Sequence, residues 1–108
     1  MKYLLLICVT EGVEVRPEDA DAQPWVDEMT SRGVRLLGNR LQSISDATTV
    51  QVRNGELLIS DGPFAETKEQ IAGFDIIECA DLDEAIEVAS KHPVTRFGKI
   101  EVRPFWQE

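Results

Sequence analysis

The sequence contains few of the residues that usually build metal or disulfide sites. Among its 108 residues there are two cysteines and one histidine, and Cys8 and Cys79 share no CxxC motif. A zinc site would therefore need mostly carboxylate ligands, which is rare. Because both cysteines lie in apolar segments, we expect buried free thiols. We predict no metal site and no cofactor.

Basic residues are also scarce. Eleven Lys and Arg against 20 Asp and Glu give a formal net charge of −9. So acidic a chain repels phosphate backbones and anionic lipid, so we expect neither nucleic acid nor a membrane as a partner. No apolar run reaches the length of a membrane span. The apolar start is followed by Glu11 and Glu14 rather than by a small-residue cleavage site, which predicts a strand in a cytoplasmic protein.

The chain length suits one domain, spanning residues 1–108. Residues 2–9, "KYLLLICV", are predicted to form a strand with apolar side chains on both faces. A strand covered on one face only would alternate with polar residues. We therefore expect both faces of this strand to be covered.

Two amphipathic helices are predicted. The first begins at Pro17 and ends before Gly33, with Trp25 and Met29 on its apolar stripe. The second covers residues 80–93, "ADLDEAIEVASKHP", with Asp81 as N-cap and an acidic residue three positions later, as in a capping box.

Further strands are predicted at residues 34–41, 72–79 and 99–103. The runs "TTVQVR" and "ELLIS" flank Asn54-Gly55, the strongest short signal for a β-hairpin. Without the hairpin, the order is βαββαβ. The fold class is therefore α+β, a ferredoxin-like domain with an inserted hairpin.

Helices on one face of such a sheet leave its other face bare. Since the first strand is apolar on both faces, we expect a homodimer whose sheets pack face to face. The alternative is a monomer with the hairpin folded under the sheet.

The segment "SDGPFAETKEQIAGFDIIECADLDEAIEVASKHP" resembles the signature of DGPF-domain proteins, which belong to the YCII-related family. The resemblance extends to "MKYLLLI", "TTVQVRNGELLISDGPF" and "KIEVRPFW", and it is weakest over residues 11–33. It implies a dimeric α+β barrel. The wider superfamily includes cofactor-free enzymes such as muconolactone isomerase-like proteins and monooxygenases. Some DGPF proteins are associated with alternative sigma factors.

Asp61 and His92 are the candidate catalytic residues. Asp61 opens the signature and is of a type used as acid or base, and Lys68 could hold an anion beside it. The structural alternative makes Asp61 a turn cap and Lys68 part of a solvated face.

His92 has its own alternative, as a helix-end cation beside the dipole. The resemblance implies a histidine in the first helix paired with an aspartate before a proline near the end of the second. This chain departs from that pattern, because the first helix has no histidine and His92 itself precedes Pro93. The pair cannot be transferred as it stands.

Phe64, Trp25 and Arg40 are the other candidates for binding a small molecule. Phe64 could instead fill the core, Trp25 could belong to the core, and Arg40 could be a surface charge. Two functions stay open. One is a cofactor-free enzyme that moves a proton on a small organic molecule. The other is a non-catalytic module that binds a metabolite or a protein such as a sigma factor.

Overall fold

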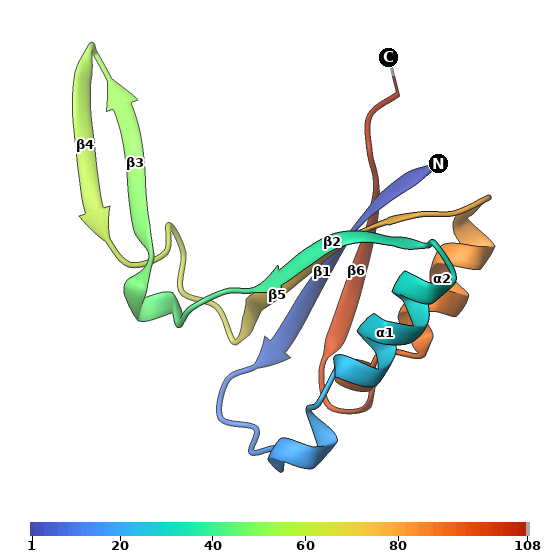
Figure 1. The fold of residues 1–108 in the computed structure, drawn as a ribbon. Helices are drawn as coiled ribbons and strands as arrows, with labels where there is room; N and C mark the ends of the chain where they lie inside the picture. Colours follow the sequence, from blue (N-terminus) through green and yellow to red (C-terminus); the bar gives the residue numbers. More distant parts are fainter. Residues whose placement is uncertain (108) are drawn as a thin grey trace.

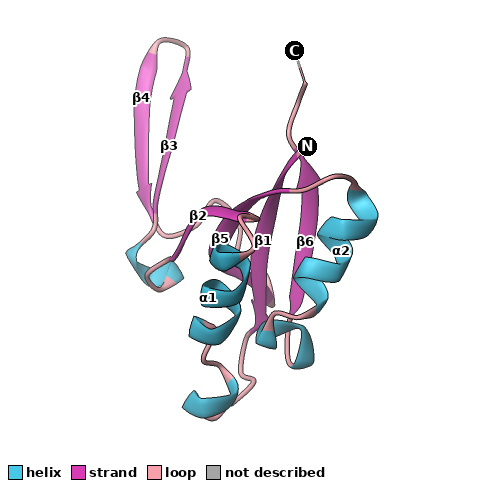
Figure 2. Cartoon of the chain, turned by 45° about the vertical axis from the view of Figure 1, so that its right-hand side comes forward, coloured by secondary structure: helices cyan, strands magenta, loops and turns pink. Residues whose placement is uncertain are grey.

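The computed structural model describes residues 1–107, and it has a four-stranded antiparallel sheet with two helices on one face and a separate two-stranded hairpin (Figures 1 and 2). The strands of the sheet lie in the order β2-β5-β1-β6. The α+β class is confirmed. The elements are β1 (Lys2–Thr10), α1 (Gln23–Ser31), β2 (Arg35–Arg40), β3 (Thr48–Arg53), β4 (Glu56–Asp61), β5 (Glu69–Glu78), α2 (Leu82–Ser90) and β6 (Lys99–Pro104), with 3-10 helices at Pro17–Asp19, Ile44–Asp46 and Pro93–Arg96.

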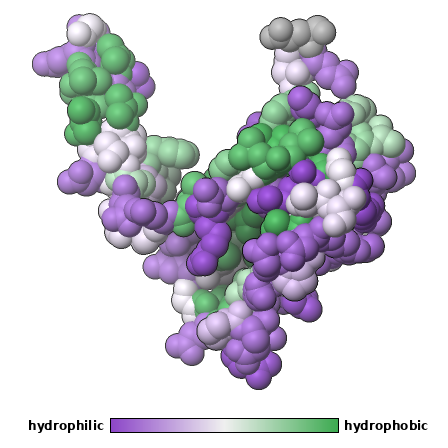
Figure 3. Space-filling model, in the orientation of Figure 1, coloured by the Kyte–Doolittle hydropathy of each residue, from purple (hydrophilic) through white to green (hydrophobic). Residues whose placement is uncertain are grey.

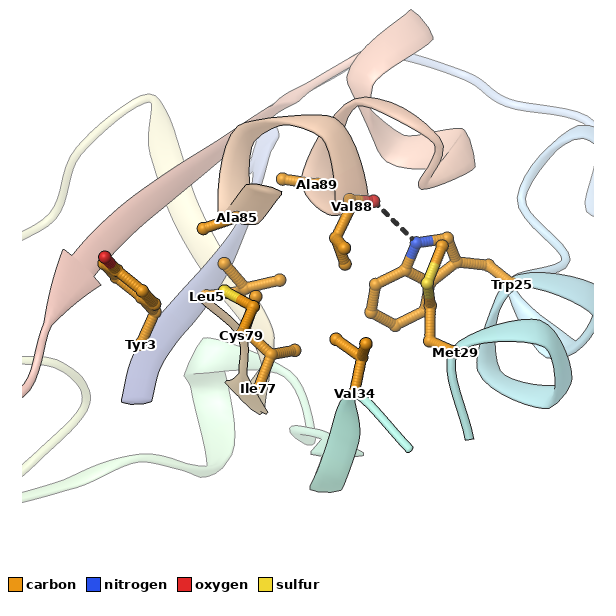
Figure 4. Close-up of a cluster of buried hydrophobic side chains, with 10 residues drawn as sticks. All are labelled: Tyr3, Leu5, Trp25, Met29, Val34, Ile77, Cys79, Ala85, Val88 and Ala89. Atoms are coloured by element: carbon orange, nitrogen blue, oxygen red, sulfur yellow. Dashed lines mark hydrogen bonds between the residues drawn. The ribbon is translucent and has the colours of Figure 1, made fainter. Parts of the chain in front are cut away.

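The core lies between the sheet and the two helices. Tyr3 and Leu5 of β1 alternate toward the helices and are 2% and 0% exposed. They meet Ile77 of β5, Met29 of α1 and buried residues of α2, as Figure 4 shows. Burial of this apolar surface supplies the main driving force for folding.

The opposite face of the sheet, here called the open face, has no helix on it (Figure 2). Leu4 pairs with Ile76 and Leu6 with Phe74, and these side chains alternate with the buried positions of β1 and β5. The four are only half-buried. The expected apolar second face of the first strand is therefore present, and nothing within residues 1–107 covers it fully.

The start of the first helix differs from the prediction. Pro17 opens a 3-10 helix, and α1 begins only at Gln23, with Pro24 in its first turn. Both prolines satisfy the same rule, because each stands where a backbone N–H has no helical partner. A proline in the first turn was thus a correct signal for the start of a helix, but the sequence contains two such prolines, Pro17 and Pro24.

The capping of α2 is confirmed. Oδ1 of Asp81 accepts a hydrogen bond from the backbone N–H of Glu84 at 2.9 Å. The Glu84 carboxylate accepts in return from the N–H of Ala80 at 2.8 Å. The first bond satisfies a donor that the first turn of the helix leaves free, and the second ties the residue before the N-cap to the same turn.

The predicted hairpin is also confirmed. Asn54 and Gly55 both have positive φ, at 53° and 76°, as a tight two-residue hairpin turn requires. We call β3, the turn and β4 (residues 48–61) the hairpin arm. It projects away from the sheet (Figure 1), so the alternative with the hairpin folded under the sheet is wrong. Within residues 1–107, no helix is both long and apolar enough for a membrane span.

Candidate functional site

A cleft of about 1090 Å³ lies on the helix side of the sheet, toward its β2 edge. Residues of β2 and β5 form one wall, and segments around the first 3-10 helix and the start of α1 form another. His92, which follows α2, closes one side. Three ionisable side chains of this cleft are largely withdrawn from water: Arg35, Asp75 and His92.

Arg35 and Asp75 form a buried ion pair across adjacent strands. Nε of Arg35 donates to Oδ1 of Asp75 at 2.7 Å, and the two side chains are 18% and 7% exposed. Neighbouring strands β2 and β5 hold the pair in register, since Gly38 is the direct partner of Asp75. Buried pairs of this kind contribute little net stability, because both charges lose their hydration.

Gly38 leaves the space that the ion pair occupies. A Cβ at this position would collide with Oδ1 of Asp75, and it would lie 2.7 Å from both Nη2 of Arg35 and the carbonyl oxygen of Phe74. Contacts this short do not occur in packed interiors. The pair therefore requires glycine at position 38.

The second carboxylate oxygen of Asp75 faces the cleft. Only Oδ1 is hydrogen-bonded within the described residues, and none of their fully buried side-chain nitrogens or oxygens lacks a partner. Oδ2 therefore reaches solvent, and Asp75 lines the cleft. Burial raises the pKa of the Asp75 carboxyl above its ordinary value, while the hydrogen bond and charge of Arg35 oppose that shift.

His92 is a neutral imidazole with a defined tautomer. Nδ1 accepts a hydrogen bond from the backbone N–H of Val94 at 3.0 Å, so the ring proton resides on Nε2. By the same reasoning as for Asp75, Nε2 is open to the cleft. Burial lowers the pKa of His92 from 6.5 to about 4. The ring therefore presents an N–H donor at neutral pH, and the alternative of a helix-end cation is wrong.

Trp25 supports His92 from α1. The indole Nε1 donates to the carbonyl oxygen of Val88 at 2.9 Å (Figure 4), which fixes the ring between the two helices. Trp25 is 4% exposed and belongs to the core. It orients the imidazole and forms no wall of the cleft.

The other predicted residues lie in different places. Arg40, at the end of β2, lines the cleft. Asp61 ends β4 on the hairpin arm and is exposed, as is Lys68 just before β5. Phe64 is 91% exposed, so its alternative role in the core is wrong, and it lines a separate groove of about 510 Å³ at the base of the arm. The structure brings His92 and Arg40 to one cleft and leaves Asp61, Phe64 and Lys68 outside it.

Sequence reasoning missed Arg35, Gly38 and Asp75. A signal for Asp75 existed, because it is the one charged residue within the apolar run "GFDII". Period-two alternation places Gly73, Asp75 and Ile77 on one face of the strand, so the sequence alone could have predicted a buried charge at Asp75. Nothing in the local pattern identifies Arg35 as its partner, because the pairing depends on strand register.

No group of three or more His, Cys, Asp or Glu side chains within residues 1–107 is arranged to hold a metal ion. Glu18 and Asp21, at the outer wall of the cleft, are the other acidic residues that line it besides Asp75. The polar groups of Arg35, Asp75 and His92 at the cleft offer both hydrogen-bond donors and acceptors, as sites for organic ligands do.

Comparison with known proteins gives one family. The family model of the YCII-related domain matches residues 1–108. An uncharacterised protein of Rhizobium meliloti (strain 1021), R00369, is 48% identical over 69 residues, which cover 60% of this chain. The matched part spans 54% of that relative's length.

Proposed function

The chain belongs to the YCII-related family, and from that premise we propose that its cleft binds a small organic molecule and transfers a proton on it without a cofactor. The Arg35–Asp75 ion pair carries the proposal. A charge pair that the core could replace with apolar side chains is retained at the floor of an open cleft. Such departures from packing rules are expected at functional sites.

In this proposal Asp75 is the acid–base group. Its free Oδ2 faces the ligand, while Oδ1 is held by Arg35. A carboxyl whose pKa is raised by burial is a better proton acceptor than one in water. Arg35 stabilises the ionised form and keeps the carboxylate in one orientation.

His92 serves as a hydrogen-bond donor and not as the base. Its Nδ1 is occupied by the N–H of Val94, and its Nε2 already carries a proton. A neutral imidazole N–H directed at a carbonyl oxygen stabilises the negative charge that develops when a neighbouring C–H is deprotonated. The substrate that fits these roles is a small carbonyl compound with an acidic C–H bond.

The test is deuterium exchange, which detects proton transfer without knowledge of the product. The protein is incubated in D₂O with a panel of small ketones, 2-oxo acids and lactones, and loss of each C–H signal is followed by proton NMR. We expect catalysed exchange for at least one compound, a loss of about 100-fold or more in Asp75→Asn, and little change in Asp83→Asn, an exposed residue of α2.

Asp61→Asn separates this proposal from the expectation drawn from the signature. Exchange that survives Asp75→Asn but is lost in Asp61→Asn would place the chemistry on the hairpin arm and overturn the proposal.

A second candidate is a binding module without chemistry. The occupied Nδ1 of His92 favours it, because one of the two expected acid–base groups cannot accept a proton there. In that case small-molecule binding, followed by amide chemical shifts, would be saturable and weakened by Asp75→Asn, while no compound of the panel would exchange. A protein ligand such as a sigma factor would bind at a surface outside the cleft.

We also propose that the chain works as a homodimer whose open faces pack together. Leu4, Leu6, Phe74 and Ile76 form an apolar strip along β1 and β5, bordered by the charged side chains of β6. Two such strips joined face to face would remove both from water.

A further inference from the structure

The hairpin arm has one apolar face and one mainly polar face. Val50 pairs with Ile59 and Val52 with Leu57, so these four side chains share a face. They are between 59% and 63% exposed. The other face carries Gln51, Arg53 and their partners.

The rest of the chain, as far as the structure describes it, does not cover this apolar face. β3 and β4 pack on each other and on little else, and Figure 3 shows the apolar side chains of the arm gathered on a projection separated from the body. The base is tied by Gly62 N–H to the Ala47 carbonyl at 2.7 Å and by the Thr49 hydroxyl to the Gly62 carbonyl at 2.8 Å. An isolated two-stranded hairpin is marginally stable in water, so the arm needs a surface to pack on.

The accessible surface area of the chain indicates how much area an association could bury. The accessible area is 7853 Å² for a mass of 12.1 kDa, whereas a folded monomer of this mass exposes about 6000 Å². The radius of gyration is 15.9 Å, against about 13 Å for a compact chain of this length. The excess of about 1800 Å² per chain, doubled for two chains, falls within the range buried by obligate homodimers.

The net charge argues against anionic lipid and nucleic acid as occupants. A chain of formal charge −9 is repelled by anionic lipid and nucleic acid. The arm itself carries one basic residue, Arg53, whereas segments that bind membranes are rich in Lys and Arg. A second copy of the chain offers what the arm lacks, because it brings its own uncovered apolar surface.

We propose that the apolar face of the hairpin arm packs on a second copy of this chain, reciprocally in a two-fold dimer. The inference rests on the homodimer proposed above and adds a second contact to it. Each copy then receives the partner's arm as well as the partner's open face. The arm is thus an association element, and its turn at Asn54-Gly55 positions two strands for a surface that only the other copy supplies.

Two matched double variants test the arm separately from the open face. Val52→Thr with Ile59→Thr makes the apolar face polar while keeping β-branched residues. Gln51→Thr with Leu58→Thr introduces the same two threonines on the opposite face, where only Leu58 of the two replaced residues is apolar. Sedimentation equilibrium gives the dimer dissociation constant. We expect it to rise about tenfold or more for the first pair and to stay within about twofold for the second.

The outcomes are distinguishable. A wild-type chain that stays monomeric up to about 100 μM would have a dissociation constant above that of even a weak complex. That result overturns both the dimer and the arm contact. A dimer whose dissociation constant is equal in both double variants overturns the arm contact alone.

A second measurement decides the matter if the first pair fails to fold. An equal mixture of ¹³C-methyl-labelled and unlabelled wild-type chain should show intermolecular NOEs from the methyl groups of Val50, Val52, Leu57 and Ile59. Their absence in a dimeric sample would contradict the proposal.

Discussion

The indole of Trp25 lies against the imidazole of His92, with ring centroids 4.8 Å apart and planes tilted by 60°. Trp25 comes from α1 and His92 from the segment that directly follows α2, so this contact joins α1 to the end of the second helical region beside the cleft. It also excludes water from one side of the imidazole. The state of the histidine therefore depends on the packing of both helices.

The imidazole should titrate far below neutral pH. Burial holds the pKa of His92 at about 4, compared with an ordinary value of 6.5. Because His92 is the only histidine, its ring signals in a proton NMR titration need no assignment by mutation. A midpoint near 6.5 would mean that the ring is solvated and would contradict the position described for it.

The stability of the fold should fall in mild acid because of the same residue. Between pH 6.5 and 4 the unfolded chain binds a proton that the folded chain does not, so the free energy of unfolding decreases as the pH is lowered. This residue should account for about 2 kcal/mol of loss between pH 7 and pH 5. Urea unfolding of the wild type and His92→Gln at both pH values measures it, and equal losses in the two proteins would refute the prediction.

Replacement of Gly38 should be costly. In Gly38→Ala the new methyl group meets the Asp75 carboxylate and the Phe74 carbonyl, which belongs to the backbone and cannot rotate away. We expect a loss of about 3 kcal/mol in the free energy of unfolding, at the upper end of overpacking effects. Asn39→Ala, at the next and exposed position of β2, is the control and should cost much less. Similar unfolding midpoints in urea for the two variants would show that the ion pair does not need this space.

Removal of the α2 cap should have a modest effect. Asp81→Ala deletes the acceptor for the Glu84 N–H and should lower the free energy of unfolding by about 1 kcal/mol. Asp83→Ala changes the charge of the same first turn without removing a cap hydrogen bond. Thermal unfolding of both variants checks this, and a control as unstable as Asp81→Ala would assign the effect to charge instead.

Local signals were enough to predict most of the fold. The Asn54-Gly55 turn, the capping box at Asp81 and the glycine after α1 each act over four residues or fewer, so the sequence alone displays them. The start of α1 was placed too early, at Pro17, because Pro24, seven residues further along, carries the same signal. Local rules do not decide between two equivalent signals.

The site was harder to predict, because it depends on contacts between distant parts of the chain. Arg35 and Asp75 are 40 residues apart, and their pairing follows from the register of β2 on β5. His92 was identified as a candidate, but its burial and tautomer depend on Trp25 and on the Val94 N–H. The conspicuous "DGPF" signature, by contrast, belongs to the end of the hairpin arm and the loop beyond it.

Asp75 stands in β5, which is an inner strand of the sheet with β1 on one side and β2 on the other. A pair such as Arg35→Met with Asp75→Leu would exchange two desolvated charges for apolar contacts, and changes of this type commonly leave a protein equally stable or more so. At the centre of the sheet, therefore, a gain in thermal stability would come at the expense of the proposed activity. Selection of this chain for thermal tolerance alone would be expected to erase the cleft's ionisable groups first, while leaving the fold intact.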